Sequence, residues 1–252
     1  MSHHLDHEAE HTPEAIRDRL AGHTSQGYLK DSIYGAIDGA VTTFAVVSSV
    51  AGAGLASGIV IILGLANLLA DGFSMASGNF LGTRAENQAA RRARREEEEE
   101  IEKHPEGERE EIRQIFARKG FEGETLEKVV EVITADKGRW VDVMLQEEHG
   151  VGASRPSALK AALATFGAFL VIGAIPLVAY ILNLTNPELV PEPFLPACIL
   201  TGVAFFAVGA LKGRFVDQHW ALGGAETLGV GTLAAVIAYG IGVLLRPLAE
   251  GL

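Results

Sequence analysis

The sequence predicts an all-α polytopic membrane protein with five transmembrane helices and a helical cytoplasmic insert. Its 252 residues are 48% hydrophobic, yet they include 32 acidic and 21 basic side chains. The charges gather before Ser32 and between Arg84 and Arg155, whereas the other segments form apolar runs long enough to cross a hydrocarbon core of about 30 Å. The expected parts are a polar His- and acid-rich segment (1–30), spans 1 and 2 (31–83), the insert (84–155) and spans 3 to 5 (156–252).

The overall charge restricts the classes of partner. A net charge of −11 argues against nucleic acid, whose phosphates require a basic face, and suits a cation. Cys198 lies in an apolar run, so we expect a small buried hydrophobe and neither a disulfide framework nor a thiolate zinc site. The N-terminus lacks the pattern of a cleavable signal peptide, so the first span must also act as the membrane signal.

The first 30 residues are polar. Thr12 and Pro13 are typical of the start of a helix. The residues before them combine imidazoles with carboxylates, which could bind a transition metal loosely or form a disordered tail. The imidazoles are those of His3, His4, His7 and His11.

The first predicted span runs from Ser32 to Gly54 and carries two acidic residues. Asp38 lies inside it and Asp31 at its mouth, and a separation of seven residues places both on one side of a helix. A carboxylate at membrane depth costs about 2.5 to 3.5 kcal/mol, so Asp38 is a functional candidate. The alternative is an Asp that caps a broken helix.

The second predicted span, Leu55 to Leu81, carries a polar stripe. Asn67, Asp71 and Met75 are spaced i, i+4 and i+8, which aligns an amide, a carboxylate and a thioether along one face. Together with Asp38 they form a candidate pathway through the membrane.

The second span is expected to continue as one helix to Lys103, where Pro105 ends it. Three further helices are expected at 106–118, 125–135 and 138–148, from apolar residues at helical spacing. The insert is therefore predicted to be a folded helical domain.

Acidic pairs on both sides of Pro105 suggest a metal site in the insert. Glu97 and Glu100 share a helix face before the proline, and Glu108 and Glu111 share one after it. A reversal of the chain would direct the four carboxylates at one another, which is unfavourable unless cations bind there. Met144, Glu147 and Glu148 could complete the ligand shell. A solvated acidic face is the alternative.

The last third holds three more predicted spans, at 161–182, 194–211 and 226–245, and Pro176 should kink the first of them. Glu226 is either an interfacial anchor or a pathway acid. Lys and Arg lie in the loops that would face the cytoplasm, which predicts a cytoplasmic N-terminus and insert and an external C-terminus. The pairs Gly35/Gly39, Gly54/Gly58 and Gly209/Gly213 would allow close helix packing.

These motifs resemble the vacuolar iron transporter family, which includes yeast-type vacuolar iron and manganese transporters and bacterial relatives. The resemblance lies in the Asp31-x6-Asp38-Gly39 entrance, the Ser74-Met75 motif, the Glu-x2-Glu-x7-Glu-x2-Glu pattern from Glu97 to Glu111, and the segment Trp140 to Glu148. It implies a homodimer that exports cytosolic Fe²⁺, and also Mn²⁺, in exchange for protons.

The resemblance also implies roles for single residues. Asp38 and Met75 would be ligands within the membrane, Asp31 a gate, and the glutamate cluster with Met144 a capture site. The chain departs from the family pattern in two places. Asn67 stands where some members have Glu, so that Asp71 would substitute, and Leu145 follows Met144, which leaves Glu148 and Glu147 to serve.

Two functions follow as hypotheses: a proton-coupled exporter of divalent metal ions, and a membrane-anchored metal sensor or buffer without transport. Enzymatic activity is not expected, because no Ser/His pair or HExxH motif is present. No prosthetic group is expected, since Fe²⁺ and other divalent ions would bind as cargo. The other expected partners are protons and the lipid bilayer, in the inner membrane of a bacterium or the vacuolar membrane of a eukaryote.

Overall fold

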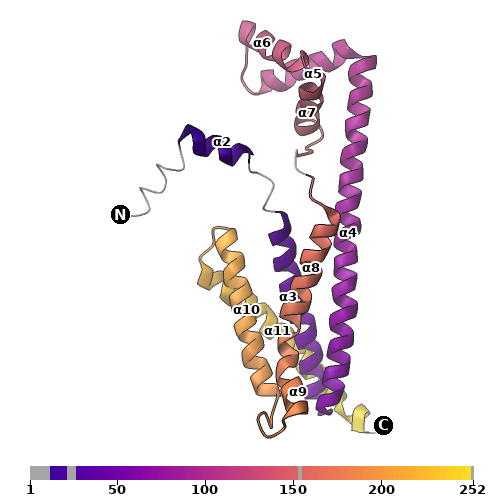
Figure 1. Ribbon diagram of the computed structural model, residues 1–252, viewed down its shortest axis with the longest axis vertical. Coiled ribbons are helices and arrows are strands. Elements are labelled where there is room, and N and C mark those ends of the chain that lie inside the picture. The colour runs from indigo at the N-terminus through magenta and orange to yellow at the C-terminus, as the bar shows by residue number, and fades with distance from the viewer. Residues whose placement is uncertain (1–11, 22–26, 153–154, 251–252) are drawn as a thin grey trace. The chain divides into compact units, whose positions relative to one another are not determined.

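The protein was analysed as a computed structural model that describes residues 12–21, 27–152 and 155–250. Throughout these ranges the regular structure is helical, with no strand (Figure 1). The helices form two compact units. We call residues 25–81 and 158–252 the membrane unit, and residues 82–157, which group with residues 1–24, the acidic unit. The predicted all-α class is confirmed.

The membrane unit contains the apolar helices. They are α3 (Gly27–Gly52), the first part of α4 (Ser57–Lys103), α8 (Ala158–Gly173), α9 (Ile175–Thr185), α10 (Phe194–Phe215) and α11 (Trp220–Glu250). Four helices in the described ranges are long and apolar enough to cross a membrane, and α8 with α9 makes a fifth span if the bent pair is counted as one. The predicted number of spans agrees with this higher count.

The break between α8 and α9 lies where the sequence placed a kink. The two helices meet at an angle of 46°, and Pro176 occupies the first turn of α9. Proline is favoured in a first turn because its missing N–H is not needed there. The predicted kink at Pro176 is therefore confirmed.

Helix α3 is the centre of the membrane unit and packs against α8, α9, α10 and α11. The packing is close because glycines face the neighbouring backbones. A Cβ added at Gly35 would lie 2.3 Å from the carbonyl oxygen of Thr165, and one added at Gly209 would lie 2.4 Å from that of Gly223. Two of the three predicted pairs, Gly35/Gly39 and Gly209/Gly213, therefore begin at points of close helix contact. In the third pair, a Cβ added at Gly58 would have nothing within 4 Å.

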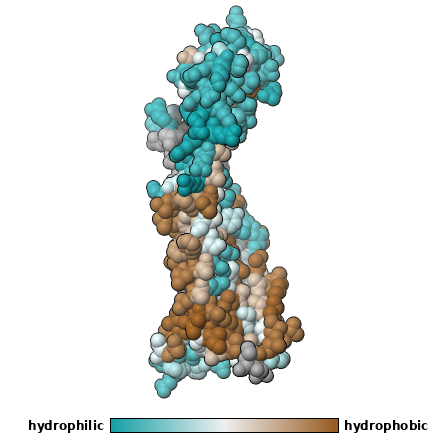
Figure 2. Space-filling model, turned by 90° about the vertical axis from the view of Figure 1, so that its right-hand side faces the viewer, coloured by the Kyte–Doolittle hydropathy of each residue, from teal (hydrophilic) through white to brown (hydrophobic). Residues whose placement is uncertain are grey.

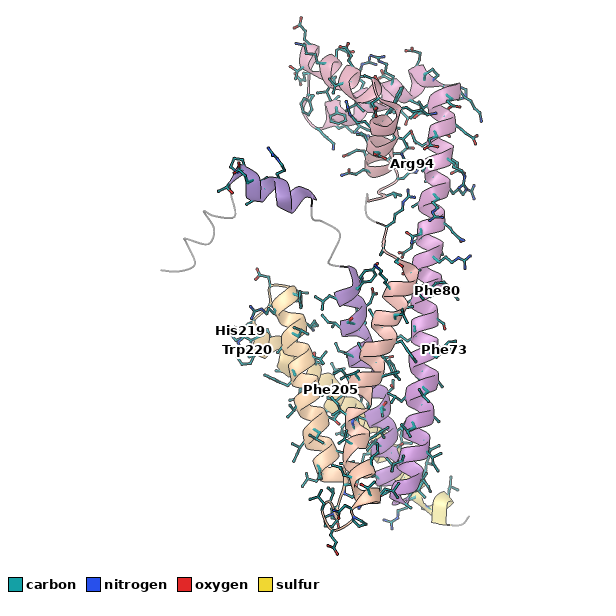
Figure 3. The ribbon with its side chains drawn as sticks, in the orientation of Figure 1. Phe73, Phe80, Arg94, Phe205, His219 and Trp220 are labelled. Atoms are coloured by element: carbon teal, nitrogen blue, oxygen red, sulfur yellow. The ribbon has the colours of Figure 1, made fainter. Side chains whose placement is uncertain are left out.

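The surface of the membrane unit is largely hydrophobic, as its face in Figure 2 shows. Large apolar side chains of α4 and α11, among them Phe73 and Leu244, are exposed, and Phe73 and Phe80 lie along α4 in Figure 3. Buried side chains such as Phe44 and Phe205 form the interior core. An apolar exterior around an apolar core is typical of a protein whose solvent is lipid.

Helix α11 begins six residues before the predicted span and includes Glu226. Glu226 accepts a hydrogen bond of 2.9 Å from Gln218 and lies 3.4 Å from the Lys212 ammonium group. It is exposed, and its partners lie in the last turn of α10 and in the polar turn before α11. Of the two predicted roles for Glu226, these contacts favour the interfacial anchor.

The acidic unit contains the rest of α4 together with α5 (Pro105–Arg118), α6 (Gly123–Thr134) and α7 (Lys137–Glu147), and also α2 (Pro13–Ala21). Its core includes Ile112, Val130, Trp140 and Met144. The exterior is hydrophilic in Figure 2. The expected helix start at Thr12 is confirmed, because its hydroxyl accepts a hydrogen bond from the N–H of Ala15.

Candidate functional site

Glutamates from α4 and α5 meet in the acidic unit. Helix α4 ends at Lys103, and α5 starts two residues later at Pro105, where the N–H of Glu108 donates to the carbonyl of His104. Glu97 and Glu100 lie one turn apart on α4, and Glu108 lies in the first turn of α5. The three residues each contribute a carboxylate oxygen to a group whose members all lie within 4.8 Å of one another.

Glu97 is the most unusual member of this group. Its side chain is 0% exposed, and neither carboxylate oxygen has a hydrogen-bond partner within the described ranges. Burial, followed by the nearby charges of Glu108 and other glutamates, raises the pKa of Glu97 to about 8. A buried, unpaired carboxylate is costly, so this position fits either a bound proton or a bound cation.

The other carboxyl groups are perturbed in the same direction. Burial and then the charge of Glu111 raise the pKa of Glu108, and burial followed by Glu148 and Glu100 raises the pKa of Glu111. One oxygen of Glu108 is buried without a hydrogen-bond partner. Like charges concentrated at one place lower the cost of binding a cation and raise the cost of leaving the site empty.

The ligands predicted on α7 have different surroundings. Glu148, just after the helix, forms a second group with Glu97 and His149 within the same 4.8 Å limit. Glu147 instead forms an ion pair with Lys119. The side chain of Met144 is fully buried in the hydrophobic core of the unit. The structure thus brings Glu148 to the acidic group and gives Glu147 a different partner.

Sequence reasoning missed His149. Its Nε2 atom lies 3.5 Å from Glu97 Oε2 and 4.0 Å from Glu148 Oε2. The residue follows the end of α7 and precedes Gly150, whose φ of +63° turns the chain, so helical spacing could not place it. The only signal was the tripeptide Glu147-Glu148-His149, which combines two ligand types.

In the membrane unit, Asp31 lies at a polar junction of three helices. Its Oδ1 atom accepts a hydrogen bond of 2.9 Å from the side chain of Asn79 on α4. The same amide nitrogen lies 2.7 Å from the hydroxyl oxygen of Thr165 on α8. Asn79 was not predicted, although it continues the polar spacing of α4 at i+4 from Met75.

Asp38 on α3 and Asp71 on α4 are both partly buried in the membrane unit. Asn67 and Met75 lie one turn to either side of Asp71, and all three side chains are partly buried. The amide nitrogen of Asn67 is buried and has no hydrogen-bond partner within the described residues. Two carboxyl groups and an unpaired amide among apolar helices form a polar site inside the membrane unit.

The chain is similar to known proteins over most of its length. The model of the VIT family matches residues 29–243. The chain belongs to the VIT family. It is 34% identical to a vacuolar iron transporter of Toxoplasma gondii (strain ATCC 50861 / VEG), over 94% of this chain and 83% of the relative. It is also 31% identical to vacuolar iron transporter 1 of Oryza sativa subsp. japonica, over 86% and 85% of the two chains.

The region matched by the VIT family includes every predicted site residue from Asp31 to Glu148. It excludes the histidines of the N-terminal segment, His3, His4, His7 and His11, which also lie outside the described residues. The family and the apolar helices together identify a membrane protein.

Proposed function

We propose that this VIT-family chain transports divalent transition-metal ions, with Fe²⁺ as the main cargo and Mn²⁺ as a second. The names of its relatives support iron as the cargo. The donor atoms support the same class of ion, because carboxylates suit Fe²⁺ and Mn²⁺ and a thioether favours softer transition ions over Mg²⁺ and Ca²⁺.

The observation that carries this proposal is the pair Asp38 and Asp71 inside the membrane unit. Two partly buried carboxyl groups on neighbouring apolar spans are costly in an apolar environment and contribute nothing to a passive anchor. A cation that passes between them offsets that cost. Met75 lies one turn from Asp71 on the same face of α4 and would add a soft ligand.

Export from the cytoplasm in exchange for protons is part of the same proposal. Protonation of Asp38 on the acidic side would weaken its attraction for the ion and release it there. The glutamate group of the acidic unit would capture ions on the cytoplasmic side, which the distribution of Lys and Arg supports. Asp71 would bind and release the proton in place of Asn67, one turn away, because an amide cannot ionise.

We also propose that two copies form the pathway together. Helix α4 is the less buried of the first two spans: 22% of its apolar stretch is buried, compared with 50% for α3. Its polar stripe would be enclosed by a second copy. A Cys introduced at the exposed Ser74, in a Cys198→Ala background, should cross-link between copies, and a monomer under the same conditions would refute the dimer.

The transport proposal is tested by ion flux into proteoliposomes with an acidic lumen. We expect Fe²⁺ uptake by the wild-type protein and loss of uptake in Asp38→Asn, which keeps the shape but removes the charge. Asp217→Asn is the matched control, because Asp217 is exposed outside the spans and has a φ of 54° that Asn also tolerates.

The outcomes separate the two hypotheses. Uptake that depends on Asp38 and increases with the proton gradient supports exchange transport. Wild-type protein that binds Fe²⁺ but gives no flux would instead support a membrane-anchored sensor or buffer. Unchanged flux in Asp38→Asn would refute the proposed pathway.

A further inference from the structure

The group Glu97, Glu148 and His149 contains a nitrogen donor beside the carboxylates of the acidic unit. Glu97 belongs both to this group and to the one with Glu100 and Glu108. The fully buried Glu97 carboxylate has no hydrogen bond within the described residues. A deeply buried acceptor without a donor is therefore shared between the two groups.

Of the two distances around His149, the one to Glu97 matches that between atoms that share an ion, and the one to Glu148 is about half an ångström longer. Donor atoms bound at about 2.0 to 2.2 Å to one metal lie roughly 3.0 to 3.5 Å from one another, from the geometry of the bonds alone. His149 Nε2 lies 3.5 Å from Glu97 Oε2 and 4.0 Å from Glu148 Oε2. A hydrogen bond would usually be shorter, at about 2.7 to 3.2 Å. A small movement of the two exposed residues would complete the set.

We propose that His149 supplies a nitrogen ligand to a second ion position formed with Glu97 and Glu148, and that Glu97 bridges it to the position formed with Glu100 and Glu108. This inference rests on the proposed function, because it requires the acidic unit to bind the cargo. The two positions differ in chemistry, since carboxylates suit Mn²⁺, Mg²⁺ and Ca²⁺, whereas imidazole suits Fe²⁺, Zn²⁺ and similar ions. His149 would therefore be a determinant of ion selectivity.

The experiment compares His149→Ala with His104→Ala in the full-length protein in detergent. His104 is the matched control, because it is an exposed histidine of the same unit and its backbone alone takes part in the turn to α5. Both variants are made in a background without the N-terminal imidazoles, which would otherwise contribute nitrogen signals. The residues replaced by Ala in that background are His3, His4, His7, His11 and His23.

Two measurements report on the nitrogen ligand. X-ray absorption at the Zn edge should show imidazole scattering in the background protein and in His104→Ala, and none in His149→Ala. The affinity for Zn²⁺ should fall by about tenfold or more in His149→Ala, in the range seen when groups around a metal are removed. The affinity for Mn²⁺ should change by less than about threefold, because the all-carboxylate position is retained.

The outcomes distinguish this inference from the proposed function. Zn²⁺ that binds without imidazole scattering in the background protein overturns the role of His149 and leaves the glutamate site intact. Absence of Zn²⁺ and Mn²⁺ binding at the cluster, unchanged by Glu97→Gln, overturns the capture site on which the inference rests. Absence of imidazole scattering from the background protein overturns the role of His149 even if His149→Ala fails to fold.

Discussion

Replacing Glu97 by Gln should stabilise the metal-free protein at neutral and alkaline pH. The wild-type carboxyl group is fully buried, has no hydrogen-bond donor among the described residues, and has a pKa raised to about 8. In the unfolded chain it would ionise near its ordinary value of 4.5. Gln has nearly the same shape but cannot ionise, so it removes the cost of keeping this acid protonated or of burying its charge.

The sign and size follow from linkage. Between about pH 4.5 and pH 8 the unfolded chain releases the Glu97 proton and the folded protein retains it, so the stability of the folded state falls as pH rises. At about 1.4 kcal/mol per tenfold change in proton affinity, the full effect is on the order of 5 kcal/mol. Glu108 and Glu111 add to the slope in the same direction, so Glu97→Gln should reduce the wild-type pH dependence without abolishing it.

The assay uses the position of Trp140 in the core of the acidic unit. In a Trp220→Phe background, Trp140 is the sole tryptophan, and its fluorescence during urea unfolding in detergent with EDTA reports on this unit. We expect a lower wild-type midpoint at pH 9 than at pH 6, and a smaller difference in Glu97→Gln. Glu131→Gln is the matched control, because Glu131 is exposed on α6.

Addition of metal should reduce the stability advantage of Glu97→Gln over the wild type. An ion at 100 times its dissociation constant stabilises the folded state by about 2.7 kcal/mol, and Glu97→Gln should lose most of this gain. A wild-type midpoint that is the same from pH 5 to pH 9, or a slope equal in Glu97→Gln and Glu131→Gln, would refute the assignment of the raised pKa to a buried, unpaired Glu97.

Two further predictions concern packing. Gly39→Ala should reduce the yield of folded protein, because the new Cβ would lie 2.5 Å from the carbonyl oxygen of Phe169. Gly167→Ala on α8 is the control and should be tolerated, because its Cβ would meet nothing within 4 Å. Equal recovery of the two variants by size-exclusion chromatography would contradict close packing of α3 on α8. Met144→Leu should change the free energy of unfolding by less than about 1.5 kcal/mol, as expected for a core swap of similar volume. It should also lower the affinity for Fe²⁺ relative to that for Mn²⁺. An unchanged ratio of the two affinities would leave Met144 as a core residue only.

The helices of the acidic unit were predictable because their limits depend on local chemistry. Helix α5 begins at Pro105, one residue before the predicted start, and ends at Arg118 as predicted, before Gly120 with its φ of +92°. Helix α7 begins after Asp136, whose side chain accepts a hydrogen bond from the N–H of Arg139. The apolar spacing also predicted α6, but Val132 is 58% exposed while Val130 is buried, so the orientation of this helix depended on its neighbours.

The residues that sequence reasoning could not place are those that depend on tertiary contacts. His149 reaches Glu97 from a turn after α7, where no helical spacing applies. Asn79 bonds to Asp31 on α3 and to Thr165 on α8, which only the packing of three helices brings together. The spacing of Glu97 and Glu100 predicted a shared face. It did not predict that Glu97 would be completely buried, which depends on α5 and α7.

The charges around the glutamate run explain why only some of its members enter the site. Glu96, Glu98 and Glu99 each form an ion pair with a basic residue four positions away on α4, namely Arg92, Arg94 and Lys103. Such pairs fix the exposed acids on the solvent side of the helix. At the same spacing Glu97 has Ala93 and Ile101, and Glu100 has Glu96 and His104, so neither has a lysine or arginine at that distance. The run of five acids therefore has an outer face that is neutralised by basic residues and an inner face, formed by Glu97 and Glu100, that is not.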